Sequence, residues 1–183
     1  MRKVKRSIQT VLFVLCCVTP QYLFAQTVSV ISDMGFGQFD FSQTFNVRLQ
    51  LATNGNMQVI GSGVSFNGGE NAGQIRITTP DTGIVEIKCA DTALLYDAAA
   101  TNLTIENIEI SVNTGVAFGA GDSCNGLGAG DAVAATIDMD AIPDPNVYIG
   151  GEIIVSSPIT LPPDQGYSTT GSGTPIMLSI VVQ

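Results

Sequence analysis

The chain has 183 residues, 45% of them hydrophobic, and a formal net charge of −9 with no histidine. That length is enough for one domain with a buried core. The missing histidine excludes Ser-His and Cys-His nucleophiles and most zinc sites, and the acidic balance argues against nucleic acid and anionic lipid as partners.

Residues 1–25 have the pattern of a secretory signal peptide, with four basic residues before an apolar run and a small residue at the expected cut. The run is too short for a membrane span, and the residues before Cys16 and Cys17 are not the small ones that precede a lipidated cysteine. Cleavage leaves a single domain, 26–183, with three basic and sixteen acidic residues and a net charge of −13. We therefore expect export through the inner membrane, with no membrane insertion after the signal is removed.

The first segment after the signal, 27–36, has alternating apolar side chains and predicts a half-buried strand. Val28, Val30, Met34 and Phe36 lie in one phase of the alternation. In fibres built by donor-strand exchange, an N-terminal strand leaves its own domain and fills a groove in the neighbouring subunit. These four residues are therefore the candidate donor strand. The alternative is that the strand pairs within its own sandwich. This alternative is favoured because an apolar strand at the end of the chain would occupy the groove that an incomplete subunit leaves open.

The rest of the chain predicts short strands separated by turn signals. Strand-like patterns occupy 57–66, 73–79, 84–89, 103–112, 132–139, 147–155 and 176–182, and Phe39 and Phe41 extend the first pattern. A change of phase between Ile105 and Ile108 predicts a β-bulge, and the alanines of 91–100 fit a single helical turn. Eight or nine short antiparallel strands without a sustained helical period predict an all-β fold, a single immunoglobulin-like or pilin-like β-sandwich.

Cys89 and Cys124 are the only cysteines after the signal, and in an exported chain they predict a disulfide. The bond would close a loop of 34 residues, 90–123. On the chain-entropy model it would stabilise the fold by roughly 3–4 kcal/mol. Redox or metal chemistry is the alternative, but neither histidine nor a further cysteine is present to support it.

Acidic pairs are the only candidates for catalysis. Glu106 and Glu109 face opposite sides of a regular strand unless the bulge brings them together. Asp138 and Asp140 are two residues apart and share a face, as the two carboxylates of a glycosidase would need to do. Exposed acids are common on an acidic sheet protein, so we expect no enzyme activity and no cofactor.

Two kinds of ligand site are weighed as alternatives. Asp138, Asp140 and Asp144 offer oxygen ligands for calcium, but their spacing is not that of an EF-hand, and an ordinary acidic loop is the simpler interpretation. Carbohydrate sites usually show aromatic platforms, and residues 26–183 contain no tryptophan. Tyr148 and Tyr167 fall on or beside the closing strands, where structural packing explains them equally well.

Three short motifs occur in order along the chain: Met34-Gly35-Phe36-Gly37-Gln38-Phe39, Val147-Tyr148-Ile149-Gly150-Gly151-Glu152-Ile153 and Pro162-Pro163-Asp164-Gln165-Gly166-Tyr167-Ser168. Together they resemble a family of small secreted Gram-negative proteins, a domain of unknown function similar to pilin-like surface subunits. The chain departs from that family at 172–175, which are inserted before the final strand. The resemblance implies a sandwich and a role at the cell surface, and it brings no catalytic residues.

These observations predict a non-enzymatic, exported protein of the periplasm, outer surface or exterior of a Gram-negative bacterium. The expected role is a structural or adhesive subunit of a fimbria-like assembly, with copies of itself or related surface subunits as partners. A ligand-binding sandwich, for carbohydrate or dependent on calcium, is the alternative.

Overall fold

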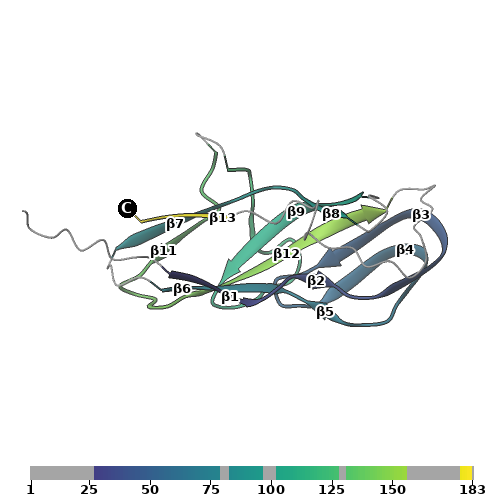
Figure 1. Ribbon diagram of the computed structural model, residues 1–183, viewed down its shortest axis with the longest axis horizontal. Helices are drawn as coiled ribbons and strands as arrows, with labels where there is room; N and C mark the ends of the chain where they lie inside the picture. The colour runs from purple at the N-terminus through teal and green to yellow at the C-terminus, as the bar shows by residue number, and fades with distance from the viewer. Residues whose placement is uncertain (1–26, 79–82, 97–101, 128–130, 156–177, 183) are drawn as a thin grey trace, which may run out of the picture.

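The computed structural model describes residues 27–78, 83–96, 102–127, 131–155 and 178–182, which form the elongated molecule of Figure 1. Among these residues every regular element is a strand and every strand pair is antiparallel, which confirms the all-β prediction. No helix able to cross a membrane occurs in the described ranges. The signal segment and the proline-rich segment with Tyr167 lie outside them.

Thirteen strands are described. They are β1 (Thr27–Ser32), β2 (Gly35–Phe36), β3 (Phe39–Leu51), β4 (Met57–Phe66), β5 (Glu70–Asn71), β6 (Gly73–Thr78), β7 (Ile84–Cys89), β8 (Ala93–Tyr96), β9 (Asn102–Val112), β10 (Asp122–Ser123), β11 (Ala135–Asp138), β12 (Asn146–Val155) and β13 (Leu178–Val182).

The main sheet is built around β12 and β9, which pair along most of their length. On the other side of β12, the first half of the strand pairs with β6 and the second half with β3. β1 continues the sheet beyond β6, and β4 continues it beyond β3. β10 and β8 pair with successive parts of the outer side of β9. On one side of β12 the sheet therefore ends at β1 and at β4, and on the other side it ends at β8 and β10 (Figure 1).

A smaller sheet, ordered β11-β7-β13, covers part of the main sheet. Val85, Ile87 and Ile137 of the small sheet and Ile77 and Val147 of the main sheet are buried in one apolar cluster. Strand alternation explains the arrangement, because every second residue of β7 and of β11 is buried. The two sheets thus form a sandwich-like core.

The glycine pair of β12 allows β3 to end close beside it. A Cβ atom on Gly150 would clash with the carbonyl oxygen of Leu51 and lie 3.0 Å from the carbonyl carbon of Ala52. Both neighbours are backbone atoms, so a side chain at Gly150 would force β3 away from the centre of the sheet. The close approach matters because the loop after β3, residues 53–55, lines a cleft on the main sheet.

The predicted half-buried strand at 27–36 is wrong over its first part. All residues from Thr27 to Ile31 are exposed, although β1 pairs with β6 through five register positions. A register shift between Val30 and Ser32 interrupts the alternation, so Ser32 pairs with Gln74 and leaves the face on which Val30 lies. The alternation of apolar residues correctly indicated a strand. It carried no information on whether another sheet covers that strand, and the small sheet leaves β1 uncovered.

The helical turn expected within 91–100 is wrong for its described part, because 93–96 form β8 and pair with β9. The bulge expected between Ile105 and Ile108 is confirmed by a positive φ of 47° at Asn107 and by the register shift opposite 150–152. The strand count exceeds eight or nine because β2, β5, β8 and β10 have only two to four residues each, too few to show a pattern.

Candidate functional site

The exposed edge of the main sheet at β1 is the first candidate. Val28 lies opposite Ile77 and Val30 opposite Ile75, and directly opposed residues of an antiparallel pair point to the same face. Ile77 and Ile75 are 0% and 6% exposed, whereas Val28 and Val30 are 46% and 67% exposed. The core face of the sheet therefore continues onto β1 without being covered.

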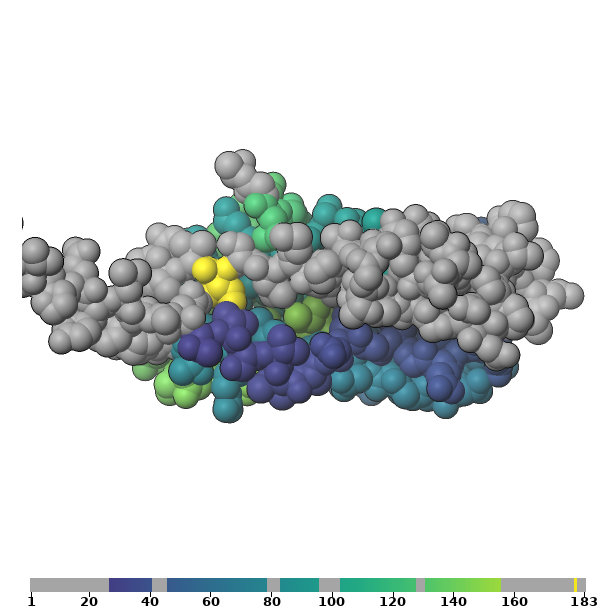
Figure 2. Space-filling view, viewed as in Figure 1, coloured from purple at the N-terminus to yellow at the C-terminus, as the bar shows by residue number. Residues whose placement is uncertain are grey.

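β1 also lacks the features that usually protect a sheet edge. Charged residues and prolines normally prevent edge strands from pairing with other chains. The six residues of β1, Thr-Val-Ser-Val-Ile-Ser, include neither. Among the described strands β1 pairs with β6 alone, so one side of its backbone is without a described strand partner. Figure 2 shows β1 in purple on the surface of the molecule.

The four candidate donor-strand residues divide into two pairs. Val28 and Val30 are exposed on β1. Met34 packs against the core, and Phe36 on β2 is buried within it. In this structure β1 therefore pairs with β6 of the main sheet of its own chain, and Met34 and Phe36, which follow β1, are held at the core. Exchange of this strand between molecules stays a prediction.

The predicted disulfide between Cys89 and Cys124 is confirmed, with a Cα–Cα distance of 5.0 Å. Cys89 ends β7 of the small sheet, and Cys124 directly follows β10 of the main sheet. Two backbone hydrogen bonds reinforce the junction, from the Cys124 amide to the Ile108 carbonyl and from the Gly126 amide to the Cys89 carbonyl. The bridge therefore joins the two layers of the fold.

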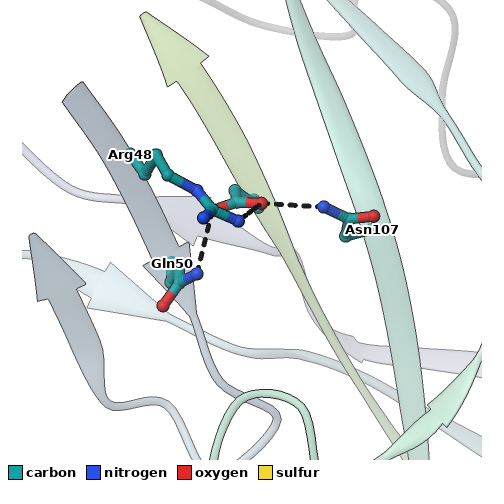
Figure 3. A network of polar contacts seen from close by, with 4 residues as sticks. Arg48, Gln50 and Asn107 are labelled. Carbon is teal, nitrogen blue, oxygen red and sulfur yellow. Dashed lines mark hydrogen bonds and ion pairs between the residues drawn. The ribbon is translucent and has the colours of Figure 1, made fainter. Parts of the chain in front are cut away.

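A buried carboxylate in β12, that of Glu152, was not among the expected site residues. Figure 3 shows Arg48 and Gln50 of β3 and Asn107 of β9 pointing toward it from both sides. Arg48 donates to both of its oxygens, Gln50 Nε2 donates at 2.9 Å and Asn107 Nδ2 at 2.7 Å. The bulge at Asn107 is what brings that amide to the carboxylate.

The charge state of Glu152 follows from these contacts. Burial opposes its ionisation, but the hydrogen bonds from Arg48, Gln50 and Asn107 and the positive charge of Arg48 outweigh burial, so the pKa of Glu152 lies below its usual value. The network is an ion pair that joins β3, β12 and β9. Since the Glu152 side chain is fully buried, we assign it a structural role.

Glu106 and Glu109, the acidic pair of β9, are brought to one face of the strand by the bulge. Glu106 lies opposite Glu152, and Glu109 lies opposite Gly150. Positions 150 and 152 are on the same face of β12, so the two glutamates share that face. Glu109 is buried beneath the following loop, where its Oε2 accepts hydrogen bonds from the amides of Gly119 and Gly121. Burial raises the pKa of Glu109, and these two bonds only partly offset it. The buried Glu109 carboxyl is enclosed by its own loop, so the pair does not form an open acid–base site.

The three aspartates weighed for calcium lie around a turn after β11. Asp138 Oδ1 accepts a hydrogen bond from the Asp140 amide, which stabilises that turn, and Asp144 has a φ of 52°. Within the ranges that the structure describes, no group of three or more acidic or cysteine side chains is placed to hold a metal ion. The calcium alternative thus finds no support in the geometry.

Comparisons with protein-family models, with curated proteins and with solved structures find no match to this chain. Function must therefore be inferred from the geometry of the molecule itself.

Proposed function

We propose that this chain is a non-enzymatic, exported protein of the Gram-negative cell surface, a structural or adhesive subunit of a fimbria-like assembly. It joins copies of itself, or related subunits, through the edge of β1. The observation that carries the proposal is the pair of exposed valines, Val28 and Val30, which share the core face with the buried Ile77 and Ile75.

The form of contact supported best is strand addition, in which a strand of a neighbouring subunit pairs with the open side of β1. β1 is already paired with β6, and β13 of the same chain pairs with β7 in the small sheet. Among the edge strands that the structure describes, β1 is the one whose uncovered valines lie on the core face, so we place the added strand beside it. A strand added there would satisfy backbone groups of β1, and its side chains would cover part of the two valines, where full burial of one valine would contribute roughly 1.5–3 kcal/mol.

The test replaces both valines in the mature protein, Val28→Ser and Val30→Ser. Because both side chains are exposed in the single molecule, we expect its unfolding free energy to change by about 0.5 kcal/mol or less. Self-association, followed by light scattering over a range of concentrations, should require at least about tenfold higher protein. The matched control is Ile84→Ser, which changes an exposed apolar residue on β7 and should leave association as in the wild type.

A disulfide variant that holds β1 on its own sheet distinguishes strand addition beside β1 from donor-strand exchange, in which β1 leaves its own sheet. Ser29 and Arg76 are directly opposed and exposed, and opposed residues in antiparallel strands are close enough for a disulfide. The oxidised Ser29→Cys/Arg76→Cys protein holds β1 on its own β6, so strand addition predicts normal assembly. Loss of assembly in this variant would favour donor-strand exchange. A wild-type protein that stays monomeric at millimolar concentration would contradict both.

A further inference from the structure

A polar cleft of about 370 Å³ opens on the face of the main sheet opposite the apolar core. It lies where β1, β6 and β12 meet two loops, 53–55 and 113–115. Its volume falls within the range of roughly 300–1,000 Å³ typical of small-molecule sites. The cleft is separate from the uncovered valines of β1, which lie on the core face.

The floor of the cleft belongs to a row of side chains that crosses four strands, and the first three members of the row, Ser32, Gln74 and Tyr148, line the cleft. Ser32 on β1 lies opposite Gln74 on β6, Gln74 lies opposite Tyr148 on β12, and Tyr148 lies opposite Ser111 on β9. Directly opposed residues share a face, so these four side chains form one line. The register shift after Val30 is what places Ser32 in this line. The irregularity of β1 therefore contributes to the cleft.

The wall of the cleft is formed by two loops that pack against each other through their backbones. A Cβ atom on Gly115 would lie 2.5 Å from both the Asn54 Cα and the Thr53 carbonyl oxygen, so only glycine permits this contact. The Thr53 hydroxyl accepts hydrogen bonds from the Val116 amide and the Ser111 hydroxyl, both at 2.8 Å. The Asn54 amide donates to the Val116 carbonyl. These bonds fix the wall in place without a ligand.

The lining keeps both donors and acceptors available. Asn54 and Asn113 each use the side-chain oxygen to accept a backbone amide, which leaves their NH₂ groups for other partners. Asn71 uses its NH₂ group on the Asp33 carbonyl, which leaves its side-chain oxygen. Among the described residues, the side chains of Gln74 and Tyr148 have no hydrogen-bond partner. Hydroxyl groups, which donate and accept, complement such a mixture.

The charge of the lining indicates the class of ligand. Among the residues that the structure describes, no acidic or basic side chain lines the cleft. A phosphate, a carboxylate or an amine would find no counter-charge there. Tyr148 supplies an aromatic surface beside the amides, a combination of an apolar face with a few oriented polar groups that suits small polar ligands.

We propose that this cleft binds a neutral saccharide unit, with the Tyr148 ring against a sugar face and the side chains of Gln74, Asn71, Asn54 and Asn113 on its hydroxyls. Structural packing alone would account for a tyrosine on a closing strand, but not for the line of polar side chains and the walls that enclose it. The inference does not depend on the contact at β1.

The test measures binding of neutral glycans to the mature, oxidised protein. The probes are an array of neutral glycans and, in solution, saturation-transfer NMR with glucose, galactose, mannose, N-acetylglucosamine and neutral disaccharides at millimolar concentration. We expect binding to one or more of these probes, and about tenfold weaker binding after Gln74→Ala or Tyr148→Ala, the loss expected for one or two hydrogen bonds or a stacking contact. Tyr148→Phe should retain more affinity than Tyr148→Ala.

The matched control is Gln38→Ala, which removes an exposed glutamine outside the cleft and should leave binding unchanged. Circular dichroism checks that each variant is folded, and the Val28→Ser/Val30→Ser protein should bind as the wild type does, which separates this inference from the contact at β1. Absence of binding to every neutral probe would overturn the proposal, as would binding that persists in both Gln74→Ala and Tyr148→Ala or that is confined to anionic glycans.

Discussion

Replacement of both bridging cysteines, Cys89→Ala with Cys124→Ala, is expected to lower the free energy of unfolding by about 3–4 kcal/mol. The bridge closes a loop of 34 residues and joins the end of β7 in the small sheet to the main sheet next to β10. Without it, the unfolded chain gains conformational freedom and the two layers lose a covalent link. Urea unfolding of the mature protein measures the effect.

The double replacement is the appropriate variant because a single one would leave a free thiol in the core. Reduction of the wild-type protein provides the control, since it breaks the bond without changing the sequence, and should give a loss of similar size. A decrease below about 1 kcal/mol would mean that packing alone holds the layers together.

Removal of the positive partner of Glu152, by Arg48→Met, is expected to lower the unfolding free energy at neutral pH, because it leaves a fully buried carboxylate without its counter-charge. Loss of one partner of a fully buried pair costs about 3–5 kcal/mol. The loss here should be smaller, because the Arg48 side chain is 46% exposed and water can replace part of its contact with the carboxylate. Arg76→Met removes an exposed arginine of β6 and is the matched control, with little expected change.

The effect of Arg48→Met should depend on pH in a defined direction. Because the pKa of Glu152 is lower in the folded protein than in the unfolded chain, its stabilisation is fully present above the unfolded value and is lost as pH falls through the folded value. The difference between wild type and Arg48→Met should therefore shrink in acid. A difference that grows as pH falls, or none at pH 7, would contradict the assigned role of the pair.

Much of the fold could be predicted from local patterns. The strands at 57–66 and 84–89 have the expected bounds. The disulfide could be predicted because only two cysteines remain after the signal. The bulge near Asn107 was visible because two isoleucines that both face the core, Ile105 and Ile108, are three positions apart, and residues on one face of a regular strand are an even number of positions apart. In each case the deciding information lies within a few residues of the chain.

Features that depend on distant partners could not be predicted. Glu152 stands within an apolar strand, and a buried acid must be paired, but its arginine lies 104 positions away in the sequence. The alternation of Val28 and Val30 defines a face of β1 but not the extent of the sheet that should cover it. The cleft was missed for the same reason, because only the strand register brings Ser32, Gln74 and Tyr148 into one line.

The most direct measurement of the contact at β1 is amide hydrogen exchange of the mature protein, compared between the monomer at low concentration and the assembled form. If a neighbouring strand adds to the open side of β1, exchange across Thr27–Ser32 slows markedly on assembly, while β4, which bounds a different edge of the main sheet, exchanges as before. Exchange that is unchanged over β1 in an assembly of confirmed size would contradict the proposed contact.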